Sequence, residues 1–195
     1  MRAPVKLPEF PSPTSRRRPG RRSLLALWPT ALLVAATAAR AVAEDTPSRL
    51  DQLIAGYVLN FTRFVEWPAS LHPNEIVICV VGNPGLYSAL RTGASSASVG
   101  PHHLIARQID GEASASGCHV LYIEHASALH VAALAPMLTV SDGGGFAHAG
   151  GTIELFTQAN RLRFIINLES ARRAGLHISS NLLQLAASVE GGEPR

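Results

Sequence analysis

The sequence predicts a single-domain α/β protein in which helices flank a mixed β-sheet, with an antiparallel hairpin and a helix in its C-terminal part. Residues 75–82 contain a short, continuous, β-branched run, which is typical of a strand buried on both faces of a parallel sheet. From Leu50 onward, apolar residues recur at the spacing of one helical face. Residues 152–156 and 161–168 flank a turn, and the second segment alternates in the manner of a hairpin strand.

The first 43 residues are predicted to be a cleavable signal peptide that exports the protein. A basic stretch precedes an apolar run over residues 24–39, and the small residues Ala41 and Ala43 fit the two positions that signal peptidase reads. The alternative is a membrane anchor, but this run is shorter than the ~20 residues of a spanning helix and contains Pro29. We therefore expect a mature chain of residues 44–195 that forms one domain.

Removal of the signal peptide reverses the net charge of the protein. Of the 17 basic residues, 8 precede position 44, whereas only one of the 14 acidic residues, Glu9, does so. The mature chain thus keeps 9 basic and 13 acidic residues, a formal net charge of −4. Because the basic character belongs to the removed segment, we predict no nucleic-acid partner.

The 2 cysteines, Cys79 and Cys118, both lie in the mature chain. An even count and an exported location favour a disulfide bond. The alternative is a pair of buried reduced thiols, since cysteine is often a small core residue. If bonded, the pair closes a loop of about 40 residues, which chain-entropy reasoning values at roughly 4 kcal/mol.

The first predicted helix begins near Thr46 as its N-cap, with Pro47 at the first helical position, and ends after Trp67 because Pro68 follows. Its apolar face is Leu50, Leu53, Ile54, Tyr57, Val58, Phe61, Phe64 and Val65. After the strand of residues 75–82, a turn leads into a short helix over residues 86–91. The stretch of glycine, alanine and serine over residues 93–100 is predicted to be a loop.

Further strands are predicted over residues 104–109, 119–123 and 137–140, with a helix over residues 127–134 before the last of them. The hairpin then turns at Gln158, Ala159 and Asn160. A small helix is predicted at residues 170–174. A second is predicted at residues 180–189, with a buried face of Leu182, Leu183, Leu185, Ala186 and Val189.

No catalytic motif occurs: the chain lacks a G-x-S-x-G nucleophile elbow, an H-E-x-x-H zinc pair and a phosphate-binding G-x-x-x-x-G-K. We therefore predict neither an enzyme nor a cofactor. Seven of the eight histidines lie between His72 and His148, but His125 and His130 do not share a helical face. Solvated or core histidines are thus favoured over a metal site.

Two sets of aromatic and polar residues are candidates for contact with a partner or ligand. Trp67 lies beside Glu66 and Arg63 at the end of the first helix, and Arg163 and Asn167 share one face of the hairpin with Arg161. Tryptophan and arginine are enriched where proteins meet partners. The alternative is a tryptophan packed over the core and arginines that face only water.

Three separated blocks of sequence carry a family resemblance. The first is Tyr57-Val-Leu-Asn-Phe-Thr-Arg-Phe-Val-Glu-Trp-Pro68. The second comprises Ile78-Cys-Val-Val-Gly82, Cys118-His-Val-Leu-Tyr-Ile123 and Leu138-Thr-Val-Ser-Asp142. The third comprises Arg163-Phe-Ile-Ile-Asn-Leu168, Ala171-Arg-Arg-Ala-Gly-Leu-His-Ile-Ser-Ser180 and Leu182-Leu-Gln-Leu185. Together and in this order they resemble the YfiR family of small exported regulators.

The resemblance implies a non-enzymatic, homodimeric α/β repressor in the periplasm that binds the periplasmic part of a membrane-anchored diguanylate cyclase. Such a repressor limits cyclic di-GMP production and biofilm formation. The resemblance also implies a structural disulfide between Cys79 and Cys118, while the chain lacks the second cysteine pair that helps to set redox sensitivity in some relatives. Two alternatives stay open: a periplasmic small-solute-binding module whose pocket contains Trp67, Arg163 and His177, and an enzyme that uses the histidine-rich middle of the chain.

Overall fold

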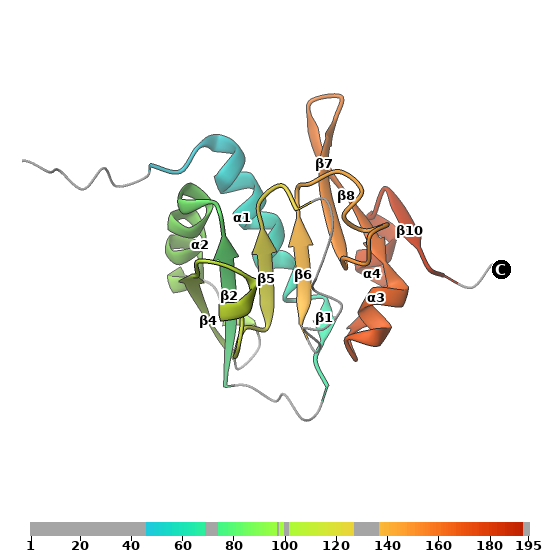
Figure 1. The fold of residues 1–195 in the computed structure, drawn as a ribbon, viewed down its shortest axis with the longest axis horizontal. Coiled ribbons are helices and arrows are strands. Elements are labelled where there is room, and N and C mark those ends of the chain that lie inside the picture. Colours follow the sequence, from blue (N-terminus) through green and yellow to red (C-terminus); the bar gives the residue numbers. More distant parts are fainter. Residues whose placement is uncertain (1–45, 69–73, 97, 100–101, 127–136, 193–195) are drawn as a thin grey trace, which may run out of the picture. The chain divides into compact units, whose positions relative to one another are not determined.

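A mixed sheet of eight strands forms the centre of the described part of the chain (Figure 1). The structure is a computed structural model that describes residues 46–68, 74–96, 98–99, 102–126 and 137–192. These residues all belong to one compact unit, residues 43–195. The predicted signal peptide of residues 1–43 and the predicted helix of residues 127–134 lie outside the described residues.

The strand order of the sheet is β10-β8-β7-β6-β5-β2-β4-β3. Neighbouring strands from β4 to β7 pair in parallel, β7 and β8 form the predicted antiparallel hairpin, and β10 returns parallel to β8. This arrangement confirms the predicted α/β class with a mixed sheet. The strands are β2 (Glu75–Val81), β3 (Ser98–Val99), β4 (His102–Gln108), β5 (Val120–Ile123), β6 (Leu138–Ser141), β7 (Ile153–Gln158), β8 (Arg161–Asn167) and β10 (Ser188–Glu190).

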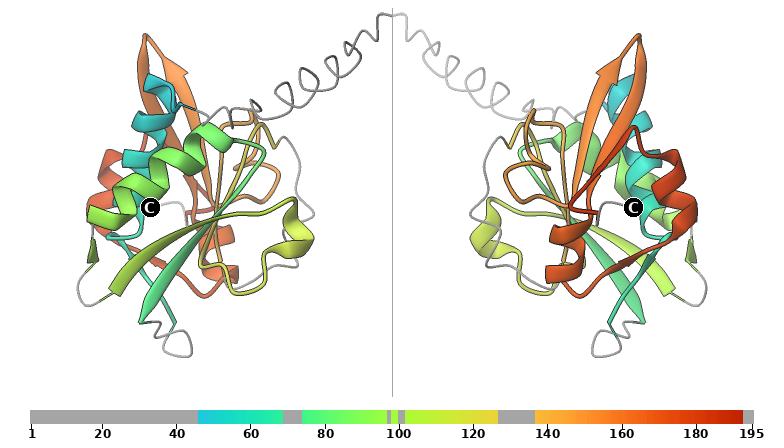
Figure 2. Two further views of the ribbon diagram at one scale, coloured as in Figure 1. Left: turned by 90° about the vertical axis from the view of Figure 1, so that its left-hand side faces the viewer. Right: turned by 90° about the vertical axis from the view of Figure 1, so that its right-hand side faces the viewer.

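The two faces of the sheet bury different sets of side chains. The larger core lies on the face covered by α1 (Arg49–Phe61) and α2 (Pro84–Ser96), and it also takes residues from α3 (Leu168–Arg173) and α4 (Ser180–Leu185). On the other face, the chain around the short 3-10 helix η2 (Glu112–Ser114) covers a smaller core (Figure 2). Successive residues of β5 alternate between these two cores, as the two-residue period of a strand requires.

The first helix is shorter than predicted at both ends. Its N-cap is Ser48 and not Thr46, because Ser48 and Asp51 form a capping box with backbone-to-side-chain hydrogen bonds of 3.0 and 2.8 Å. The helix ends at Phe61, and Val65 and Glu66 instead form strand β1, which pairs with β9 (His177–Ile178). Val65 is buried in β1, as it would be on the apolar face of a longer helix, so the spacing of apolar residues did not distinguish the strand from the helix.

The second helix is longer than predicted, since α2 continues through residues 92–96 into the segment expected to be a loop. The side chain of Asn83 accepts a hydrogen bond of 2.7 Å from the backbone N–H of Leu86 at the start of the helix. Within the helix, Gly93 packs against α1: a Cβ at this position would lie 2.6 Å from Cδ1 of Leu59. Small residues therefore allow close contact between the two helices here, and they do not mark a loop.

The last helix is also shorter than predicted. It ends at Leu185, and Ser188, Val189 and Glu190 form the edge strand β10. Leu182 is buried as predicted, but Leu185 and Val189 are 63% and 39% exposed. Val189 lies opposite Ile166 of β8, so pairing with the sheet edge overrides the helical spacing of these residues.

Candidate functional site

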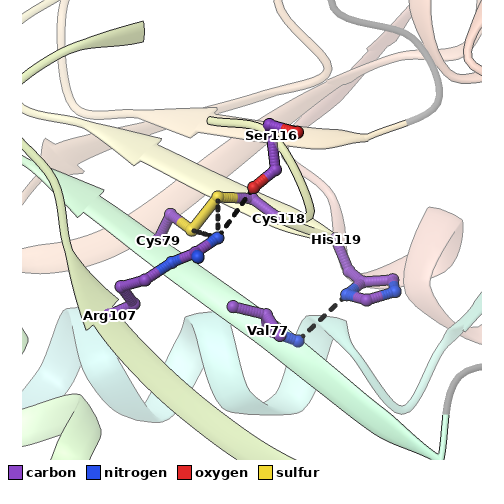
Figure 3. The surroundings of a disulfide bond; sticks show 6 residues. All are labelled: Val77, Cys79, Arg107, Ser116, Cys118 and His119. Carbon is purple, nitrogen blue, oxygen red and sulfur yellow. Dashed lines mark hydrogen bonds between the residues drawn. A yellow bond between two sulfur atoms is a disulfide. The ribbon is translucent and has the colours of Figure 1, made fainter. Parts of the chain in front are cut away.

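Cys79 and Cys118 form a disulfide bond, with their Cα atoms 5.9 Å apart (Figure 3). Cys79 lies in the middle of β2 and is fully buried, while Cys118 lies just before β5 and is 6% exposed. The bond joins β2 to the turn just before its parallel neighbour β5, on the face of the sheet that carries the smaller core. The structure thus selects the disulfide over the alternative of two reduced thiols.

The guanidinium of Arg107 lies directly beside this bond (Figure 3). Its Nη2 atom is 3.2 Å from Sγ of Cys118 and 3.5 Å from Sγ of Cys79, and it donates a hydrogen bond of 3.0 Å to the carbonyl of Ser116. Arg107 belongs to β4, where it is the register partner of Cys79 in β2. Side chains of register partners project from the same face of a sheet, which explains why the guanidinium reaches the sulfurs.

His119 follows Cys118 and ties the start of β5 to β2. Its Nδ1 atom accepts a hydrogen bond of 3.0 Å from the backbone N–H of Val77 (Figure 3). Burial lowers the pKa of His119 below its ordinary value of 6.5. Because only a neutral imidazole has an acceptor nitrogen, the lowered pKa and the hydrogen bond both favour the neutral ring.

Four of the residues predicted to contact a partner lie in or beside the β1–β9 ribbon. Glu66 of β1 stands opposite His177 of β9, and both side chains are exposed. Arg63, also exposed, lies in the turn that leads from α1 into the ribbon. Trp67 directly follows β1, and its ring meets that of His119 edge-on with the centroids 5.9 Å apart. The ribbon therefore brings together four residues that the sequence placed in two separate segments.

The indole N–H of Trp67 is buried and has no hydrogen-bond acceptor among the described residues. The ring itself is partly buried and packs against the larger core. Leaving a buried donor unpaired typically costs about 1–3 kcal/mol, so an acceptor that reaches this N–H when the surrounding chain opens would bind favourably.

The other two predicted contact residues lie on β8, in the large sheet. The side chain of Arg163 is exposed. Asn167, by contrast, is engaged within the fold: its Nδ2 atom donates a hydrogen bond of 2.7 Å to the carbonyl of Ala147, and its Oδ1 atom accepts one of 2.9 Å from the backbone N–H of Ser170. Asn167 thus caps α3 and holds the loop of residues 142–151.

Carboxylates and hydroxyls at the ends of β5, β6 and β7 hold loops in place. Asp142 accepts a hydrogen bond of 2.7 Å from the backbone N–H of His125, whose φ of 52° lies in the left-handed region. Glu154 is only 7% exposed, and its two oxygens accept hydrogen bonds of 3.1 and 3.0 Å from the backbone N–H groups of Gly145 and Ala147. Asp142 therefore fastens the chain after β5, and Glu154 holds the loop of residues 142–151.

Burial also affects Tyr122, which lies in β5 with no exposed surface. Burial, followed by the neighbouring carboxylate of Asp142, raises the pKa of its hydroxyl well above the ordinary value of 10.0. The hydroxyl therefore stays protonated at physiological pH.

Within the described ranges, no group of three or more histidine, cysteine, aspartate or glutamate side chains is arranged to hold a metal ion.

Sequence reasoning missed Arg107 and His119 as parts of the site. Their roles depend on the register between parallel strands, which the sequence does not specify locally. A signal was present for His119, since it adjoins Cys118 and begins a predicted strand.

Among the described helices, none combines the length and apolar character needed to cross a membrane.

Comparison with known proteins adds two findings. The crystal structure of a conserved domain protein from Vibrio cholerae O1 biovar eltor overlaps 72% of this chain with a TM-score of 0.48 and 15% sequence identity. The matched part spans 60% of that protein's chain. Separately, the sequence model of the YfiR/HmsC-like family matches residues 51–187, which is most of the chain. This chain belongs to the YfiR/HmsC-like family.

Proposed function

We propose that this protein is a non-enzymatic periplasmic repressor that binds the periplasmic part of an inner-membrane diguanylate cyclase. By restraining the cyclase it would limit cyclic di-GMP production and biofilm formation. The observation that carries the proposal is the family match over residues 51–187. Family membership suggests that the protein regulates a diguanylate cyclase. That it binds the cyclase, that it represses it and that it is not itself an enzyme are our proposals for this chain.

A periplasmic location is supported by the predicted signal peptide and by the disulfide. Disulfide bonds persist in the oxidising bacterial periplasm and are rare in the cytosol. The Cys79–Cys118 bond joins β2 to the turn before β5, where it stabilises the central sheet. We also propose a homodimer, as the family resemblance implies.

For the cyclase contact we propose two exposed surfaces. The first is the β1–β9 ribbon with Arg63, Glu66, Trp67 and His177, which offers both signs of charge beside an aromatic ring. The second is the outer face of the β7–β8 hairpin around Arg163, with Asn167 at its base. Short exposed segments that carry tryptophan or arginine are favourable anchors for a protein partner.

Genetic epistasis tests this function most directly. Cellular cyclic di-GMP would be measured by mass spectrometry in the native strain, in the deletion strain and in a double deletion that also lacks the cyclase. The cyclase is identified by capture with this protein from detergent-solubilised membranes. We expect a rise in the single deletion that disappears in the double deletion.

Two complementing forms of the chain sharpen the experiment. The full chain should restore the low level of cyclic di-GMP, whereas a chain that starts at Glu44 and cannot be exported should not. An unchanged level in the single deletion would refute the repressor function. Full complementation by the non-exported chain would refute action in the periplasm.

One observation favours a second function, the binding of a small solute in the periplasm. The buried, unpaired indole N–H of Trp67 would donate to an acceptor on such a solute when the chain around it opens. The mature chain has a single tryptophan, since the other of the 2, Trp28, lies in the predicted signal peptide. Intrinsic fluorescence of the mature protein would therefore report on Trp67 alone. A saturable change on titration with periplasmic extract passed through a small-pore filter, together with a rise in melting temperature that a Trp67→Phe variant does not show, would support this function.

A further inference from the structure

We infer that Arg107 makes the Cys79–Cys118 bond easier to reduce, because its guanidinium stabilises the thiolate that is released when the bond opens. The inference rests on the contacts around the bond and does not depend on the proposed function. It concerns how this one bond responds to a dithiol reductant, such as dithiothreitol or a protein with two neighbouring thiols.

The geometry holds the guanidinium at the bond in a defined position. Nη2 of Arg107 lies within 3.5 Å of both sulfurs, and its hydrogen bond to the carbonyl of Ser116 fixes it there (Figure 3). The loop passes beside the group at Gly117, where an added Cβ would be in ordinary contact with Nη2 at 3.9 Å, and the rest of the Arg107 side chain is exposed. The contact thus involves β4, β2 and the turn before β5 together.

The guanidinium interacts much more strongly with the reduced state than with the oxidised state. A disulfide sulfur is neutral and a weak hydrogen-bond acceptor, whereas a thiolate is charged and forms charge-assisted hydrogen bonds. Burial opposes thiolate formation here, since Cys79 is fully buried and Cys118 is 6% exposed. A nearby cation offsets that cost and lowers the pKa of a thiol. Arg107 therefore shifts the equilibrium toward reduction.

The reaction is ordinary thiol–disulfide exchange. A thiolate of the reductant attacks the Sγ atom of one cysteine and forms a mixed disulfide, and the S–S electron pair leaves on the other sulfur as a thiolate. The second thiol of the reductant then displaces the protein from the mixed disulfide. Two electrons and one proton pass from the dithiol to the protein, which ends with one thiol and one thiolate beside Arg107, and the reductant ends as a disulfide. Whichever protein sulfur leaves first, it lies within 3.5 Å of Nη2.

The test uses the mature protein and three variants. Arg107→Gln removes the charge but keeps a long side chain that can donate to Ser116, and Arg107→Lys keeps the charge. Arg91→Gln is the matched control, because Arg91 is an exposed arginine on α2, which covers the opposite face of the sheet. Each protein is equilibrated in dithiothreitol buffers of graded potential, and its free thiols are trapped by alkylation and counted by mass spectrometry.

We expect Arg107→Gln to shift the equilibrium toward the disulfide by about fivefold or more, with Arg107→Lys between it and the native protein. Arg91→Gln should match the native protein. Salt at 1 M should weaken reduction of the native protein and have little effect on Arg107→Gln, since it screens the charge. Melting temperatures of the oxidised proteins confirm that each variant folds.

Two outcomes would overturn the inference. In one, Arg107→Gln is oxidised, folded and reduced with an equilibrium constant within twofold of the native value. In the other, Arg107→Gln is reduced more readily than the native protein, which would show that the guanidinium mainly shields the sulfurs from attack.

A second measurement covers the case in which Arg107→Gln does not fold. In a Cys79→Ser variant, the pKa of the remaining Cys118 thiol is obtained from the pH dependence of its alkylation rate. The rate profile at low salt should shift to higher pH at 1 M salt if Arg107 stabilises the thiolate. A profile that does not move with salt would contradict the inference.

Discussion

Nδ1 of His119 accepts a hydrogen bond of 3.0 Å from the backbone N–H of Val77, which fastens the start of β5 to β2 beside the disulfide bond. This bond requires a neutral ring, and burial lowers the pKa of His119 below 6.5. The unfolded chain therefore binds a proton at this residue at a higher pH than the folded protein does. The contribution of His119 to stability is complete above pH 6.5 and is lost as the pH falls toward the lower folded pKa.

We accordingly predict that the melting temperature of the mature protein falls as the pH drops below about 6.5, and that a His119→Gln variant loses part of this dependence. Glutamine keeps a side-chain acceptor for the N–H of Val77 but does not titrate. Thermal unfolding followed by circular dichroism across this pH range measures the effect. His103→Gln is the control, since His103 is exposed on β4. Identical pH profiles for the native protein and His119→Gln would contradict the prediction.

The disulfide bond is predicted to be mainly structural. It closes a loop across a sequence separation of 39 residues, which corresponds to about 4 kcal/mol in the chain-entropy model. A Cys79→Ala, Cys118→Ala double variant should therefore show a lower free energy of unfolding by up to that amount in urea titration. Cellular cyclic di-GMP should change little in this variant, once the amount of exported protein is matched to that of the native chain. A double variant as stable as the native protein would show that the bond contributes little.

Glu154 is predicted to be a stability residue and not a contact residue. Its buried carboxylate accepts hydrogen bonds from the N–H groups of Gly145 and Ala147, so Glu154→Ala leaves two donors without a partner. We expect a loss of about 2–4 kcal/mol in the free energy of unfolding. Glu75→Ala, which removes an exposed carboxylate at the start of β2, should change it by less than about 0.5 kcal/mol. Equal losses in the two variants would argue against this role.

The sequence predicted the class of the fold and most strands because their signals are local. The β-branched run of β2 and the alternation of β8 each identify a strand without knowledge of its neighbours. Val65 and Val189 were misassigned because strand pairing with distant residues overrides helical spacing. The contact between Arg107 and the disulfide was not predictable, since it depends on the register that places Arg107 opposite Cys79. The cysteine count and the predicted export favoured the disulfide bond, and family resemblance supplied the functional hypothesis, which periodicity alone could not.

The last prediction concerns the cyclase contact. Glu66 and His177 are paired across the ribbon, so a change at either residue alters the same exposed surface. If that surface meets the cyclase, His177→Glu should place like charges opposite each other and raise cellular cyclic di-GMP toward the level of the deletion. Charge reversal at a protein contact can cost several kcal/mol of binding. Arg163→Glu tests the hairpin surface in the same way, and Arg91→Glu on α2 is the control for a charge reversal elsewhere.

Folding and export separate loss of contact from loss of protein. Each variant is first compared with the native chain for its amount in the periplasm and its melting temperature, because like charges across a strand pair can also weaken the ribbon itself. For that reason His177→Ala accompanies His177→Glu: it removes the side chain without adding a charge. A ribbon that meets the cyclase should give a graded rise in cyclic di-GMP, smaller for alanine than for glutamate. If both His177 variants fold, reach the periplasm and repress as well as the native protein, while Arg163→Glu does not, the contact lies on the hairpin and the ribbon is excluded.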